Sequence, residues 1–160
     1  MDIELERLAR AVKQAQHRQQ RALDRALGNI GTTLVQWDAM RAIAAEPGAS
    51  AHRLALATFQ TDQAFGTLAN RLEAQHLIER GPGEGRRIAH RLSRRGRQML
   101  ADANVVAERV RNELYVDLSA ADRRALAKLL ERVLADNKAA DLVLPGQKQR
   151  ARLKTAPPLG

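Results

Sequence analysis

The sequence predicts a mainly helical protein with one small β-hairpin. Apolar residues recur every three or four positions over most of the chain, which is the spacing of an amphipathic helix. Several of these stretches follow a Ser or Thr that can cap a helix, and end near Gly or Pro. Between residues 77 and 92, two short β-like segments flank the turn-forming sequence PGEG, which predicts a hairpin.

The N-terminal third of the chain predicts two helices. The first is long, because an apolar stripe runs through residues 5–27 before glycines interrupt it. The second follows Thr32 or Thr33 as its N-cap and ends before Pro47. Its inward face is expected to carry Leu34, Trp37, Met40 and Ala44.

Residues 50–75 predict two short helices joined by a tight turn. Ser50 caps the first, which extends through about Thr58, and Thr61 caps the second. The second helix directs Phe65, Leu68 and Leu72 inward. The hairpin follows directly, so residues 31–97 are expected to form a winged helix-turn-helix lobe, with the hairpin as the wing.

Two further helices and a tail complete the chain. A long helix from Ser93 and a last helix opened by the capping box Ser119-Ala-Ala-Asp122 both carry apolar stripes. Residues 139–160 are basic and rich in proline, and are expected to be disordered. The terminal helices, residues 1–30 and 98–138, carry more apolar surface than the lobe can cover, so they are expected to pair across a homodimer on a palindromic DNA site.

The charge of the chain indicates a polyanionic partner. Its formal net charge is +9, and clustered Lys and Arg gain affinity by releasing counterions from phosphates. Only 2% of the residues are aromatic, so the stacking platforms that bind single strands are poorly supplied, and duplex DNA is favoured. No apolar run could span a membrane and no signal peptide is apparent, so a soluble, cytoplasmic protein without a membrane partner is expected.

The helix after Thr61 has a polar outward face. Gln63 and Asn70 can each bond the edge of an adenine through both amide groups, and Thr67 can bond a base or touch a thymine methyl group. Gly66 would allow the helix to approach the groove floor. An ordinary solvated face is the alternative interpretation. The expected DNA-contacting residues of this helix are Thr61, Gln63, Thr67, Asn70 and Arg71.

Arginines are concentrated in and just after the predicted hairpin: Arg80, Arg86, Arg87, Arg91, Arg94, Arg95 and Arg97. Arg86, at the glycine-rich tip, can enter a minor groove, and its neighbour Arg87 is also expected to bind DNA. Solvated or internally paired arginines are the alternative. Arg94, Arg95 and Arg97 occupy the first turn of a helix, where cations are unfavourable; an external anion or a carboxylate from another helix would explain them equally well.

Three motifs resemble those of the MarR family of transcriptional regulators. They are RLEAQHLIER at residues 71–80, EGR at 84–86 and LSRRG at 92–96. The family pattern is a recognition helix ending in Arg-Leu-Glu, a Gly-Leu-Ile-x-Arg strand, an Asp-x-Arg wing and Leu-Thr-x-x-Gly. The resemblance extends over roughly residues 5–138.

Three residues depart from this family pattern. Glu84 replaces Asp and Ser93 replaces Thr, and both keep the chemistry of the residue they replace. His76 replaces the glycine that usually ends the recognition helix, so an unchanged turn requires His76 to adopt a left-handed conformation.

The resemblance implies a sequence-specific DNA-binding regulator, a repressor, whose DNA affinity a small-molecule effector modulates. It places the effector pocket near His17, Trp37, Met40 and Phe65, although simple core packing of these residues is the alternative. No cofactor and no metal are expected, because the histidines lack metal-ligand spacing and the chain has no cysteine. No nucleophile or acid–base pair indicates an enzyme. A non-specific architectural DNA-binding protein and a winged-helix protein-interaction module remain alternative functions.

Overall fold

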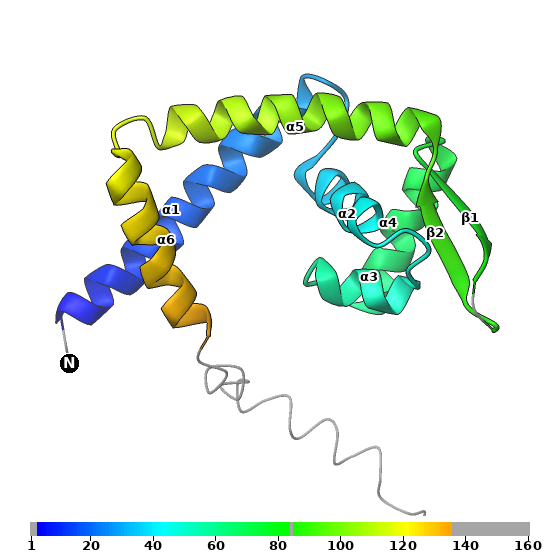
Figure 1. Cartoon of the computed structure of the whole chain (residues 1–160), viewed down its shortest axis with the longest axis horizontal. Coiled ribbons are helices and arrows are strands. Elements are labelled where there is room, and N and C mark those ends of the chain that lie inside the picture. Colours follow the sequence, from blue (N-terminus) through cyan, green and yellow to red (C-terminus); the bar gives the residue numbers. More distant parts are fainter. Residues whose placement is uncertain (1–2, 84, 136–160) are drawn as a thin grey trace, which may run out of the picture. The chain divides into compact units, whose positions relative to one another are not determined.

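The computed structural model describes residues 3–83 and 85–135, which form six helices and one antiparallel hairpin (Figure 1). The predicted fold class is therefore confirmed. Glu84 and the tail predicted at residues 139–160 lie outside the described residues. The elements in chain order are α1 (Ile3–Gly28), α2 (Leu34–Ala45), α3 (Ala51–Ala57), α4 (Asp62–Ala74), β1 (Ile78–Pro82), β2 (Ile88–Leu92), α5 (Arg94–Leu114) and α6 (Ala120–Leu134).

The chain divides into two compact units between Tyr115 and Val116. The described part of the second unit is α6 with its capping box. Ser119 Oγ accepts a hydrogen bond from the Asp122 amide at 3.1 Å, and the Asp122 carboxylate accepts one from the Ser119 amide at 3.1 Å. The Ser119 hydroxyl also donates to the Asp122 carboxylate at 2.6 Å, and this bond, together with the one from the Ser119 amide, lowers the pKa of Asp122. None of the residues of α6 is buried within the chain.

In the first unit, helix N-caps lie where the sequence predicts them. Thr33 caps α2, Ser50 caps α3, Thr61 caps α4 and Ser93 caps α5, each side-chain oxygen accepting a backbone N–H of the first turn. One detail of α2 is wrong: Ala44 is exposed, and the neighbouring Ile43 is buried in its place.

Two apolar clusters hold the first unit together. The larger lies inside the helix-turn-helix, where the predicted inward residues of α4 pack against α2, α3 and the hairpin. The smaller joins α5 to the C-terminal half of α1, as the crossing of these helices in Figure 1 indicates. Its buried residues are Leu23, Leu27, Trp37, Ala103, Ala107 and Val110.

The turn after α4 is unchanged from the family pattern, and His76 adopts the left-handed conformation that such a turn requires. His76 has a φ of 57°, its N–H bonds the carbonyl of Glu73 at 2.9 Å, and the N–H of Leu77 bonds the carbonyl of Leu72 at 2.8 Å. This pair of bonds is a Schellman motif, and the buried side chains of Leu72 and Leu77 supply its usual apolar contact. The motif is kept although histidine replaces the favoured glycine.

The same turn is fastened to the start of α5. Ser93 Oγ donates to the carbonyl of His76 at 2.6 Å and accepts from the Gly96 amide at 2.9 Å, while the Ser93 amide donates to the carbonyl of Leu77 at 3.1 Å. A Cβ atom on Gly96 would lie 1.9 Å from that carbonyl oxygen. Only glycine therefore allows α5 to start this close to the end of α4.

We expect Gly96→Ala to destabilise the protein by roughly 1–3 kcal/mol, the usual cost of overpacking a close contact. Thermal unfolding followed by circular dichroism measures it. Gly66→Ala is the matched control, because a Cβ at this position in α4 meets no atom within 4 Å. The control should gain about 0.5–1 kcal/mol from the better helix propensity of alanine. Equal melting temperatures for the two variants would contradict this account.

Candidate nucleic-acid interface

The outward face of α4 is polar, opposite the buried Phe65, Leu68 and Leu72. A shallow hollow of about 460 Å³ runs along this face. The structure brings four of the five predicted residues of this helix together around it: Thr61, Gln63, Thr67 and Arg71. The fifth, Asn70, is also exposed but faces the hairpin.

The hydrogen bonds already made by these residues limit what each can offer a ligand. Thr61 Oγ1 accepts from the Ala64 amide at 3.1 Å, which is its capping role. Thr67 Oγ1 donates to the Gln63 carbonyl at 3.1 Å, so the outward side of Thr67 offers oxygen lone pairs and a methyl group. The side-chain amide of Gln63 makes no hydrogen bond within residues 3–83 and 85–135, so its carbonyl oxygen and its NH₂ group are both available to a ligand.

Asn70 is tied to the hairpin through Arg80 of β1. Arg80 Nη2 donates to Asn70 Oδ1 at 2.8 Å, and Arg80 Nε donates to Glu73 Oε2 at 2.9 Å; Nη2 also bonds the Glu73 carboxylate. The hydrogen bond from Arg80 lowers the pKa of Glu73, and the same bond raises the pKa of Arg80. The sequence places Arg80 in the arginine-rich stretch that indicates a polyanionic partner, and the structure shows its guanidinium engaged within the protein.

The tip of the hairpin presents two exposed arginines, Arg86 and Arg87. The Gly83 amide bonds the Arg87 carbonyl at 2.9 Å and closes the turn, while Gly85 has a φ of 63°. A Cβ on Gly83 would lie 2.9 Å from the Arg87 carbonyl oxygen, so the turn requires glycine there. Arg86 makes no ion pair with a carboxylate of the described residues.

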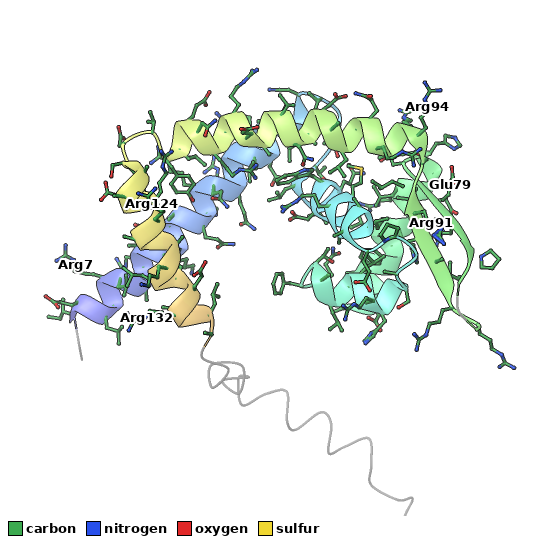
Figure 2. The ribbon with its side chains drawn as sticks, viewed as in Figure 1. Arg7, Glu79, Arg91, Arg94, Arg124 and Arg132 are labelled. Carbon is green, nitrogen blue, oxygen red and sulfur yellow. The ribbon has the colours of Figure 1, made fainter. Side chains whose placement is uncertain are left out.

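The arginines of the first turn of α5 separate into two groups. Arg97 Nη1 donates to the Leu92 carbonyl at 2.8 Å and stabilises the end of the hairpin. Arg94 and Arg95 are exposed, and Arg94 projects outward from the N-terminal end of α5 (Figure 2). Neither forms an ion pair with any carboxylate in the described part of the chain, so this part supplies no internal compensation for their charge.

The residues expected around an effector pocket are not brought together. His17 is exposed on α1, beside Arg18, Arg21 and Arg25. Met40 and Phe65 are fully buried in the helix-turn-helix cluster, and Trp37 is buried in the other cluster, where its Nε1–H donates to Asn104 Oδ1 at 2.9 Å.

A different cavity, of about 640 Å³, lies between α2, the end of α3 and α5. Its lining residues are Asp38, Arg41, Ala42, Ala44, Ala45, Ala57, Thr58, Phe59, Leu100 and Asn104. Partial burial raises the pKa of Asp38, although Arg41, 3.6 Å away, opposes this shift. The alanines leave the space that the cavity occupies, and sequence reasoning gave no signal for it.

Phe59 is the most unusual residue of this cavity. It is 99% exposed and has a φ of 55°, in the turn between α3 and α4. The Gln60 amide bonds the Ala55 carbonyl at 2.9 Å and the Phe59 amide bonds the Leu56 carbonyl at 3.3 Å, so Phe59 occupies the glycine position of a second Schellman motif. A phenyl group here is left uncovered by the described residues.

Two further searches concern the described residues only. They contain no group of three or more His, Cys, Asp or Glu side chains that could hold a metal ion. They also contain no helix that is both long and apolar enough to cross a membrane.

Comparison with known sequences finds a MarR family profile and repressors of the helix-turn-helix type. A sequence profile described as "MarR family" matches residues 30–88. The HTH-type transcriptional repressor Rv2887 of Mycobacterium tuberculosis is 28% identical over 113 residues, which cover 69% of this chain and 81% of that protein. The repressor Mb2911 of Mycobacterium bovis aligns with the same identity and coverage.

Solved structures of similar fold include the MarR family protein Rv2887 of M. tuberculosis in complex with salicylic acid, with a TM-score of 0.65 and 25% identity over 79% of this chain and 95% of that chain. Rv2887 in complex with DNA has a TM-score of 0.68 at 23% identity, over 79% and 96% of the two chains. A cysteine-to-serine mutant of MarR from E. coli, complexed with operator DNA, has a TM-score of 0.76 at 20% identity, over 84% and 99%.

Proposed function

We propose that this chain is a homodimeric transcriptional repressor of the MarR family that binds duplex DNA through α4 and the hairpin. The observation that carries the proposal is the outward face of α4, where Gln63, Thr67 and Arg71 line one exposed strip above a buried apolar face. A helix of this form can enter a major groove and bond base edges. A cytoplasmic location and the absence of a catalytic step are part of the proposal.

The hairpin supplies the second contact. Arg86 lies at a tip held by tight glycine turns and has no core to pack against, so its guanidinium is free to enter the flanking minor groove. Arg87 of the hairpin, with Arg94 and Arg95 of α5, would bind backbone phosphates, which explains why these cations lack partners within the described residues. The DNA complexes of Rv2887 and of E. coli MarR support this role.

Dimerisation follows from apolar surface that each unit leaves uncovered. In the first unit, α1 exposes Leu8 and Val12 at 57% and 45%. In the second, α6 exposes Leu129 and Val133 at 55% and 68%. A second copy of the chain would bury these side chains and would present two copies of α4 to half-sites about 10–10.5 base pairs apart.

Selection of bound sequences from randomised duplexes tests the proposal. A palindromic operator should emerge, and random DNA should compete for it poorly. An architectural protein that binds by charge alone would select no sequence, and a protein-interaction module would retain no duplex.

Gly66→Ala separates binding from folding. The substitution should stabilise the fold, because the added methyl group meets no atom of the chain. It should nevertheless weaken operator binding, because a methyl group on the outward face holds α4 away from the bases. Fluorescence anisotropy with the selected operator measures the affinity, and random DNA reports the contribution of charge. Unchanged operator affinity would remove this face from the interface.

The double variant Leu129→Asp/Val133→Asp tests the dimer. Both side chains are largely exposed within one chain, so the carboxylates should cost the folded monomer little and the dimer much. Light scattering at micromolar concentration should give the mass of one chain for this variant and of two for the wild type. Lys128→Asp, on the opposite side of α6, is the control and should stay dimeric. A monomeric wild type would end the dimer proposal.

We propose that the cavity beside Phe59 binds the effector. Its volume suits a small organic molecule, four of its ten lining residues are alanine, and Arg41 can bond a carboxylate. Leu100 and Asn104 of α5 form one side of the cavity, and residues of α2 and α3 form the other. A ligand bound there would therefore change the position of the helix-turn-helix relative to α5. The salicylic acid complex of Rv2887 supports an aromatic acid as the class of ligand.

Ala44→Trp tests this site. Ala44 is exposed and lines the cavity, so a bulky side chain there should fill the space without disturbing the core. Millimolar salicylate should release the operator from the wild type but not from the variant, whose DNA affinity without salicylate should be unchanged. Release of both proteins at the same salicylate concentration would place any salicylate site elsewhere.

A further inference from the structure

We propose that Asn70 acts on DNA as a hydrogen-bond donor alone and selects guanine, because Arg80 of β1 occupies its amide oxygen. Arg80 is then a positioning residue for base recognition rather than a DNA contact. The inference rests on the proposed function, since it concerns what the outward face of α4 recognises in the major groove. It differs from the expectation that Asn70 bonds adenine through both of its amide groups.

The geometry of Arg80 fixes the side chain of Asn70. Arg80 Nη2 lies 2.8 Å from Asn70 Oδ1, and the same guanidinium is held by Glu73, with Nε 2.9 Å from Oε2. The Arg80 side chain is only 26% exposed, so its position is constrained by the fold. Glu73 lies one turn after Asn70 on α4, which places the carboxylate and the amide on the same side of the helix, facing β1.

The chemistry of the pair decides which way the amide points. A guanidinium has only donors, so the amide oxygen must face it; the reverse orientation would set the amide NH₂ against another donor. The Nδ2 group of Asn70 is therefore directed away from Arg80. It makes no hydrogen bond within residues 3–83 and 85–135, and both of its hydrogens are available.

The base preference follows from this arrangement. Guanine presents two adjacent acceptors, N7 and O6, in the major groove, whereas adenine presents the acceptor N7 beside the donor N6 amino group. Bidentate recognition of adenine needs the Asn oxygen as an acceptor. One lone pair of that oxygen remains, but it lies beside the positive charge of Arg80, which disfavours an approaching amino group. A donor-only Asn70 therefore favours guanine.

The test begins with the operator selected by the wild-type protein. The position read by Asn70 is the one whose base preference disappears when Asn70→Ala is put through the same selection. A G·C pair is expected there, and replacing its guanine with 7-deazaguanine should weaken wild-type binding about tenfold, within the range of one good base contact. An A·T pair at this position, no loss with the analogue, or no position that depends on Asn70 would each overturn the inference.

Arg80→Met removes the guanidinium but keeps a long apolar stem. If it folds, as circular dichroism reports, the freed oxygen of Asn70 should shift the preference at this one position from guanine towards adenine. Unchanged guanine preference would overturn the role of Arg80. Should the variant unfold, the analogue measurement on the wild-type protein still decides the question. A wild-type protein that selects no sequence at all would instead refute the proposed function.

Discussion

The close approach between Gly96 and the carbonyl of Leu77 is the contact on which the arrangement of α4, the hairpin and α5 depends. It lets α5 begin directly against the end of α4, where Ser93 bonds His76, Leu77 and Gly96 together. The hairpin begins and ends beside this contact, since Ile78 at the start of β1 pairs with Leu92 at the end of β2. Helix α4, the hairpin and α5 therefore share one junction, and none of them can shift there without the others.

The arginines of the hairpin and of the first turn of α5 differ in their surroundings. Arg97 bonds a backbone carbonyl and Arg80 bonds Glu73, so these two cations stabilise the hairpin from within. Arg86, Arg87 and Arg94 remain exposed. The arginines are thus divided between two that bond within the protein and others whose guanidinium groups are exposed.

The caps, the inward face of α4 and the left-handed His76 could be predicted because each depends on residues close together in the sequence. Arg80 and Asn70 are ten residues apart on different elements, so only the packing of β1 against α4 brings them together. The cavity beside Phe59 was also beyond prediction, because it arises from alanines contributed by separate helices. The predicted pocket residues Trp37, Met40 and Phe65 proved to be core residues, for which large apolar side chains are equally suited.

The length of α5 determines how far the shared junction moves when this helix tilts. Its 21 residues extend over about 31 Å, close to one turn of B-DNA. If its far end is held, a tilt of about ten degrees moves the junction by roughly 5 Å, a displacement that follows from the rise per residue. Because α4 is fastened to that moving end, a tilt of α5 displaces α4 as well. In the proposed DNA complex, a disturbance too small to alter the core would then be enough to move α4 out of the major groove.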